Sequence, residues 1–443
     1  MDKRKRAVLR YLKIAVFLIC FIKPLCAGTR LYALDYSDVI SSLSDLGYFS
    51  SNKNEGITSF RSLLIPVGGR PESLGSAFTG LGDDASYINY NAAAGCIMND
   101  TQASVYHNSW IADSKLDTLV YTTRIDNFGF GLGAGCLYLP FTEYNLFGER
   151  VNSSYYTETN LAANLSYNFL AGYDFKGLAM GATVRTAFRG MPDYTDNNTD
   201  TIIPFSGLAQ SSFALMADVG IMLQFNFLKF FASRTPNVRI GLAAQNLGAA
   251  FTGIGSKKGM RLDDPLPSYF AAGISCQFLP VITATFDIKQ PVNLQNPSQY
   301  QMFSVSGGLI LAFTKNFNLL LGTEFKGGNP RFSSGAEIQL TNARLNFNYT
   351  LDLTSSFNPV NRISVSAKIM LGDRGRAQRQ KIIDELYSRG LDYYANSEWE
   401  EAIEVWQEIL VLNKRYDPAI LGIESARAQI EMYKKVRESM FFE

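Results

Sequence analysis

The chain has 443 residues, 41 of them basic and 40 acidic, with one His and five Cys. A net charge of +1 gives no excess of basic residues of the kind that nucleic-acid-binding proteins carry. With a single imidazole, at His107, we predict no enzymatic activity, no catalytic residue, no metal and no cofactor. The charged fraction of 18% lies below the roughly 25% of soluble domains and disfavours an ordinary cytosolic protein.

Residues 1–33 have the pattern of a secretory signal peptide. Residues 3–6 are all basic, and the apolar run over residues 11–22 is too short to span a bilayer as a helix. Small residues at Ala27 and Ala33 offer two cleavage positions. We therefore predict export of the protein, with cleavage after residue 27 or 33.

Residues 34–101 show no regular alternation, and their second half is rich in Gly, Ala and Ser. Small residues at this density allow close backbone packing and unusual dihedral angles. Such a composition suits a compact segment inside a narrow tube better than a flexible linker. We therefore predict that residues 34–101 form a plug inside the structure made by the residues that follow.

Residues 102–371 alternate between apolar and polar with a period of two. In residues 344–352, Leu345, Phe347, Tyr349 and Leu351 share one face, and the residues between them are polar or charged. Segments of about ten such residues are long enough to cross a bilayer as tilted strands. The alternation predicts strands at 102–110, 115–124, 128–139, 157–169, 175–188, 211–226, 237–247, 267–279, 281–290, 300–313, 316–326, 331–340, 343–352 and 361–371.

The connections between these strands alternate in length, which is typical of outer-membrane barrels. We therefore predict an all-β transmembrane barrel of about 14 antiparallel strands in the bacterial outer membrane. An even number of strands returns the chain to its starting side, so both the N-terminal segment and the C-terminal tail are expected in the periplasm. The tight turns fall at 126–127, 279–280, 314–315 and 341–342, and the long connections fall near 140–156, 189–210 and 248–266.

A soluble β-sandwich or propeller is the alternative fold, because alternating strands also occur there. The polar faces here carry mostly Ser, Thr, Asn, Gly and Gln with isolated charges, which favours a polar lumen over a solvated surface. Aromatic residues also gather near strand ends, as membrane-interface girdles do. They are Tyr106, Trp110, Tyr138, Phe141, Phe225, Phe227, Phe230, Phe231, Phe313 and Phe317.

The Gly- and Ala-rich run over residues 69–95 resembles the N-terminal hatch of FadL-type outer-membrane proteins, which transport long-chain fatty acids and other hydrophobic compounds. The hatch motif of that family, Asn-Pro-Ala, falls on Asn91, Ala92 and Ala93, with Gly95 shortly after. Ala92 replaces the Pro, and Ala does not fix φ as Pro does. The same signature occurs in secretion-associated PorV-like proteins and in an uncharacterised FadL-like branch.

The resemblance implies passive passage of apolar molecules through a pocket in the lumen and a lateral opening in the wall. Arg185 and Arg239 lie on the polar faces of their strands, and we predict that they pair with the carboxylate of a fatty acid. The predicted partners are thus a hydrophobic ligand and outer-membrane lipid. The alternative is a PorV-like scaffold that transports nothing and recruits periplasmic or surface partners, and the plug-like segment disfavours a hydrophilic porin.

The third predicted strand is unusually rich in glycine, with Gly129, Gly131, Gly133 and Gly135 at alternate positions. One interpretation is a kinked or weakened element of the wall. The other is ordinary barrel curvature. The sequence leaves both open.

Residues 372–443 have a different composition, with 25 charged residues in 71 from residue 373 onward, against 56 in the preceding 372. Their periodicity predicts helices at 379–396 and 398–413 and a third from about 417 to 438. The pattern resembles a tetratricopeptide repeat, in which small and aromatic residues interlock two antiparallel helices. The residues that match it are Leu386, Gly390, Tyr393, Ala402 and Trp406.

A single repeat with a capping helix is fewer than the three repeats usually needed for independent stability. We therefore expect the tail to dock on the mouth of the barrel or to bind a periplasmic protein. A solvated structural cap is the alternative.

Overall fold

The computed structural model describes residues 58–440, apart from gaps at 111–112, 146, 197–198, 200, 255, 257–258, 299–300, 327–328 and 354–359. The predicted signal peptide and the first part of the predicted plug, through residue 57, lie outside the described residues. Within the described ranges, helices capable of spanning a membrane are absent.

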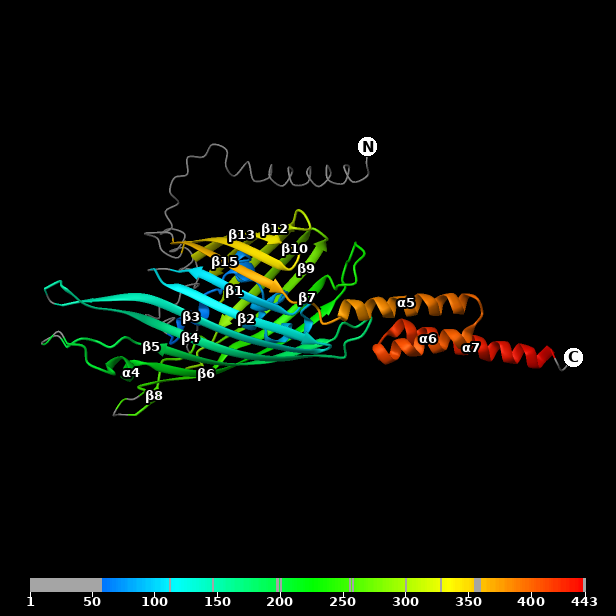
Figure 1. Ribbon diagram of the computed structural model, residues 1–443, viewed down its shortest axis with the longest axis horizontal. Helices are drawn as coiled ribbons and strands as arrows, with labels where there is room; N and C mark the ends of the chain where they lie inside the picture. Colours follow the sequence, from blue (N-terminus) through cyan, green and yellow to red (C-terminus); the bar gives the residue numbers. More distant parts are fainter. Residues whose placement is uncertain are drawn as a thin grey trace, which may run out of the picture. The chain divides into compact units, whose positions relative to one another are not determined.

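Fourteen antiparallel strands close into a barrel, as predicted (Figure 1). The first strand pairs with the last, and the remaining pairings close the sheet on itself. The strands are β1 (Gln102–Ser109), β2 (Lys115–Ile125), β3 (Phe128–Tyr144), β4 (Arg150–Phe169), β5 (Leu178–Gly190), β6 (Ser212–Phe225), β7 (Val238–Thr252), β9 (Tyr269–Leu279), β10 (Ile282–Pro291), β11 (Ser304–Ala312), β12 (Phe317–Lys326), β13 (Asn329–Gln339), β14 (Ala343–Asp352) and β15 (Val360–Met370). The two-residue strand β8 (Arg261–Leu262) pairs with the end of β7.

The predicted tight turns all join neighbouring strands at one end of the barrel, which we call the turn end, and the predicted long connections lie at the opposite loop end. The largest difference from the prediction is the connection at 140–156. Most of it is strand, because β3 and β4 stay paired as far as Tyr144 and Arg150. Its Tyr, Thr and Val residues favour strand, so the hairpin continues beyond the alternating core of the wall.

Side chains of the wall alternate between an apolar outside and a polar inside. Along β6 this pattern holds from Ser212 to Leu223, with Phe213 and Leu215 exposed on the outer face and Asp218 buried inside. The arrangement is the reverse of that in a soluble barrel and is the one expected where the outside contacts hydrocarbon. Tyr106 departs from its predicted place in an aromatic girdle, since it faces inward and is fully buried.

The lumen is filled by residues 58–101, which we call the inner segment. The backbone N–H of Ser59 donates to the carbonyl of Pro265 at the loop end (3.0 Å). Thr101 exchanges hydrogen bonds with the residues after β15 at the turn end (2.8 Å). The segment contains the short helices η2 (Arg61–Leu64), α3 (Gly69–Ser73), η3 (Ala85–Asn89) and η4 (Ala92–Ile97), and its apolar side chains, among them Leu74, Phe78, Tyr87 and Ile88, are buried.

The inner segment therefore crosses the barrel from the loop end to the turn end before β1 begins. An even number of strands brings the start of β1 and the end of β15 to the same end of the barrel, where Gln102 pairs with Met370. It does not fix the position of the residues before β1. Because the inner segment adds one more crossing, Ser59 lies at the end opposite to the C-terminal helices. This differs from the expectation of one shared side for the N-terminal segment and the tail, although residues 34–57 lie outside the described part of the chain.

The C-terminal tail forms three helices, α5 (Arg376–Ala395), α6 (Trp399–Leu412) and α7 (Asp417–Met440), close to the predicted bounds (Figure 1). Trp406 is the centre of their core and is almost fully buried. A Cβ atom on Gly390 would lie 2.3 Å from the indole nitrogen of Trp406, so only glycine fits there. Ala402 is buried in the same core, and Leu386 and Tyr393 pack against it. Membership of the tetratricopeptide class stays a prediction.

Candidate functional site

The inner segment touches the wall where inward-facing glycines leave room for its backbone. A Cβ atom on Gly181 would lie 2.1 Å from the carbonyl oxygen of Ala92, and one on Gly220 would lie 2.1 Å from Oδ1 of Asn91. Neither substitution fits unless the inner segment or the wall moves. The same approach, closer than 3.0 Å to atoms of the inner segment, occurs at Gly129, Gly241, Gly273, Gly308, Gly322 and Gly335.

The predicted hatch motif lies at one of these contacts. Asn91 precedes η4, and its side chain accepts a hydrogen bond from the N–H of Ala93 (3.1 Å) and donates to the carbonyl of Thr79 (2.9 Å). Ala92 is the first residue of η4, a position that favours Pro but needs no N–H donor. The departure from the family motif therefore keeps the start of the helix. Gly95, the fourth residue of η4, is also buried.

Two of the four alternating glycines of β3 also serve this packing. Gly129 faces the backbone of Gly95 and Cys96, and Gly131 faces the hydroxyl of Tyr87. β3 pairs with β2 and β4 without a register shift over the glycine-rich stretch. The regular pairing thus does not support a kinked strand. Gly129 and Gly131 make space for the inner segment, whereas a Cβ atom on Gly135 would lie 2.7 Å from the side chain of Asn160 on β4.

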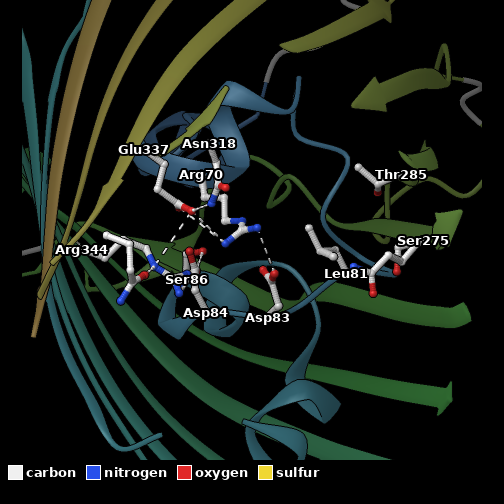
Figure 2. Close-up of polar contacts among 12 residues, drawn as sticks. Arg70, Leu81, Asp83, Asp84, Ser86, Ser275, Thr285, Asn318, Glu337 and Arg344 are labelled. Carbon is white, nitrogen blue, oxygen red and sulfur yellow. Dashed lines mark hydrogen bonds and ion pairs between the residues drawn. The ribbon is translucent and has the colours of Figure 1, made fainter. Parts of the chain in front are cut away.

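Buried ion pairs hold the inner segment to β13 and β15 (Figure 2). Arg70 contacts Glu337 and Asp83, each with a nitrogen–oxygen distance of 3.3 Å, as Figure 2 shows. Asp84 forms a second pair with Lys368, whose ammonium group is buried as well. Removing one member of a buried pair leaves an uncompensated charge and costs about 3–5 kcal/mol. These pairs therefore oppose any movement of the inner segment out of the lumen.

Two further carboxylates fix the inner segment through neutral donors. Asp287 of β10 accepts hydrogen bonds from the backbone N–H groups of Phe78 (2.9 Å) and Thr79 (2.7 Å). Glu72 of the inner segment accepts from Asn108 and Thr350, each at 3.1 Å. These hydrogen bonds join the inner segment to β10 and, through Asn108 and Thr350, to β1 and β14.

The two predicted ligand-binding arginines face the lumen and already have protein partners. Arg185 is buried and contacts Asp218 (3.0 Å), while a second nitrogen donates to Asn89 (2.8 Å). Arg239 donates to the carbonyl of Leu81 in the inner segment (2.8 Å). These contacts join each arginine to the inner segment and do not bring the two together. Their role as carboxylate partners stays a prediction.

A recess of about 910 Å³ lies in the outer face of the wall and crosses β3–β7, β9 and β10. Small residues, including Ala244 and Ala272, lie between large apolar side chains such as Leu242 and Phe270, which are half exposed. Gln290 is a polar residue at its margin. The sequence analysis did not predict the recess, because the recess depends on small outward residues of seven neighbouring strands that only the register of the barrel aligns.

The sequence matches a family model over residues 36–374, which covers the inner segment and the barrel and ends just before α5. The chain belongs to the uncharacterised protein family UPF0164. One UPF0164 protein of Treponema pallidum (strain Nichols) is 27% identical over 431 residues, covering 95% of this chain and 94% of the relative. A second from that organism is 26% identical over 403 residues, covering 88% of this chain and 80% of the relative.

Solved structures similar to this chain include two bacterial proteins. The Ralstonia pickettii toluene transporter TbuX has a TM-score of 0.44 and 12% identity, covering 68% of this UPF0164 chain and 98% of its own. A Pseudomonas aeruginosa FadL homologue has a TM-score of 0.44 and 11% identity, covering 69% and 99%.

Proposed function

We propose that this UPF0164 protein lies in the outer membrane and admits hydrophobic small molecules, long-chain fatty acids among them, by passive diffusion. The observation that carries the proposal is the apolar recess in the outer wall, whose volume is that of a pocket for a small ligand. The side chains around it are the ones that would face hydrocarbon. A molecule dissolved in the bilayer would reach the recess without crossing water.

The inner segment would act as a hatch that blocks the axis of the barrel. A hydrophilic solute moving along the axis would have to displace a segment held by buried ion pairs and by backbone contacts with the wall. This argues against a general porin. It also favours a route for apolar ligands through the wall.

An irregularity in the wall lies beside the recess. The pairing of β6 with β7 shifts register between Ala217 and Val219, and Asp218 accepts a hydrogen bond from the N–H of Asn246 (2.6 Å) in place of the regular ladder. A bulge interrupts the ladder and weakens the local pairing. Because Val219 and Ala244 of these strands also line the recess, we propose that ligands cross the wall here.

Uptake of a fluorescent long-chain fatty acid into liposomes that contain the full-length protein tests this function. We expect uptake faster than into empty vesicles, and we expect Ala272→Phe, which fills the recess from outside, to reduce the excess rate at least tenfold. Ala103→Phe is the matched control, since Ala103 faces outward on β1, away from the recess. Wild-type rates equal to those of empty vesicles would refute transport.

A scaffold that recruits periplasmic partners is the second candidate, and the tail favours it. Its helices carry apolar side chains that are strongly exposed, Val411 at 82% and Leu421 at 60%. Side chains of this kind suit a protein-binding surface. Deleting residues 373–443 and comparing the proteins that co-purify from native membranes tests recruitment, and an unchanged set of partners would contradict it.

A further inference from the structure

We infer that the first turn of α5 is a strap on the inner segment, and that the docked tail thereby keeps the turn-end exit of that segment closed. The exit consists of residues 98–101, which join η4 to β1. Met98 is buried and Asn99 is exposed, so the chain leaves the lumen at this point. The inference goes beyond the proposed function, because it concerns control of the inner segment by the tail and does not depend on any solute.

The exit is fastened by residues that follow β15. The backbone of Thr101 exchanges two hydrogen bonds with residues 371–372, each of 2.8 Å. Arg376, the first residue of α5, donates to the carbonyl of Met98 (3.1 Å) and to the carbonyl of Asn99. The last carbonyls of a helix lack partners within it. Arg376 therefore supplies donors where η4 ends.

The attachment at the exit differs in kind from those deeper in the lumen. There, side chains of the wall hold the inner segment, with Glu337 paired to Arg70 and Lys368 paired to Asp84. At the exit, Arg376 of the tail is a donor. An attachment to the wall is set once the barrel has closed, whereas an attachment to the tail changes with the position of the tail.

The orientation of Arg376 depends on the start of α5. The side chain of Asp373 accepts hydrogen bonds from the N–H groups of Gly375 (3.0 Å) and Ala377. The backbone carbonyl of Asp373 accepts another from Nε of Arg376 (2.9 Å). Asp373 thus fixes the beginning of the helix and the guanidinium group of Arg376 together. A rotation of α5 would therefore withdraw Arg376 from the exit.

The strap needs support from other contacts of the tail. Arg124 of β2 also approaches the carbonyl of Met98, with its nitrogen 3.5 Å from the oxygen. Two guanidinium groups of like charge thus meet at one acceptor, and like charges repel each other. The place of Arg376 at the exit consequently depends on contacts that hold α5 elsewhere.

Those contacts lie between α5 and connections at the turn end of the barrel. Arg379 pairs with Asp126 of the β2–β3 turn, and Asp384 pairs with Arg234 of the β6–β7 connection, each at 2.6 Å. Both pairs are largely exposed, and exposed pairs contribute little to stability. A periplasmic partner that draws the tail away would thus break them and free the exit.

Cys96 is a native reporter of the exit. Its side chain is buried at the end of η4, so a water-soluble maleimide should modify it only when this end of the inner segment opens. Mass spectrometry of the peptide that contains Cys96 measures the rate on the full-length protein in nanodiscs. We expect Arg376→Ala to raise this rate about tenfold, since a hydrogen bond from a charged donor is worth about that factor.

Two further variants test control by the tail. Arg234→Ala should also raise the rate, about two- to threefold, although Arg234 contacts α5 and not the exit. Arg374→Ala is the matched control, because it removes a positive charge two residues before Arg376, at an exposed side chain, and should leave the rate unchanged. Cys136 and Cys276 on the wall should react at wild-type rates in every variant, which shows that the barrel stays folded.

An unchanged rate in Arg376→Ala would overturn the inference. An effect of Arg376→Ala without any effect of Arg234→Ala would overturn it as well, because the fastening would then be local and independent of docking. The measurement needs no transported solute, so a failure of fatty-acid uptake refutes transport and leaves this result standing.

Discussion

At the scale of single residues, the most consequential contacts are charges buried between the inner segment and the wall. Arg70 and Glu337 are 267 positions apart in the chain and both are buried. Such a pair contributes little net stability when intact, because both charges lose their hydration, but it is costly to break. Its effect is to give the inner segment one defined position.

Glu337→Ala should lower the free energy of unfolding of the detergent-solubilised barrel by up to about 3–5 kcal/mol, since it removes one of the two carboxylates paired with Arg70 and leaves Asp83 alone to compensate the buried charge. The double variant with Arg70→Met should be less destabilised than Glu337→Ala alone, because it also removes the buried charge that has lost one of its two partners. Urea titration monitored by tryptophan fluorescence measures both. Strictly additive losses would contradict direct coupling of the two side chains.

Gly220 provides a second test at this scale. Gly220→Val should displace the inner segment from β6, because its Cβ would overlap the side chain of Asn91. Limited proteolysis should then cleave within residues 58–101, which the wild type protects. Gly307→Ala is the matched control, since a Cβ there meets only Thr323, at 3.8 Å, and should leave the protection unchanged.

At the scale of elements, the strands were predictable and their interior contacts were not. Alternation is a local property, so it predicted fourteen strands and the inward direction of Arg185 and Arg239. The partners of these residues, such as Asp218, depend on which strands become neighbours. Tyr106 shows the limit of composition, because an aromatic residue near a strand end suits either a girdle or a filled lumen.

The recess was unpredictable for a related reason. It depends on side-chain sizes at positions on seven strands that only the barrel register brings together. The glycine-rich β3 was visible in the sequence, but the reason for Gly129 and Gly131 was not, because the groups that occupy the space beside them belong to the inner segment.

The helices of the tail give a prediction at the scale of elements. Trp406→Ala should destabilise the helical tail by about 3–5 kcal/mol, since it empties the centre of the core formed by α5–α7. The barrel should keep its resistance to unfolding. Circular dichroism during thermal unfolding separates the two losses, because helix and strand signals differ. A concerted loss of both signals would mean that the barrel depends on the tail.

At the scale of the whole molecule, turns of the barrel contact the helical tail. Arg379 pairs with Asp126 and Arg234 pairs with Asp384, each at 2.6 Å. Tyr173 packs against Tyr416 with ring centroids 5.0 Å apart. Three separate connections at the turn end thus hold α5 and the start of α7.

Acid should loosen this docking. Burial alone would raise the pKa of Asp384, but hydrogen bonds from Arg234 and Gln380 outweigh burial and lower the pKa below 3.8. The contribution of this pair is therefore fully present above pH 3.8 and is lost as the pH falls through the lowered pKa. We expect a loss of only about 0.2–1 kcal/mol, because the pair is largely exposed.

Spin labels on the tail and on a barrel turn can measure this change as a broader distance distribution below pH 3.8. Asp384→Asn should give the broader distribution at pH 7. Glu385→Gln, next to it on α5, should not, because the Glu385 side chain is exposed to solvent.

The path of the inner segment also has a consequence for biogenesis. β15 is the last strand of the barrel to be synthesised, and it supplies Lys368 to Asp84 and places Arg362 3.9 Å from Glu72. Until that strand pairs with β1, Asp84 lacks Lys368, and Glu72 lacks the nearby guanidinium group of Arg362. Closing the final seam therefore also brings these two buried carboxylates close to their cations, so the last step of barrel assembly completes the attachment of the chain's own N-terminal portion.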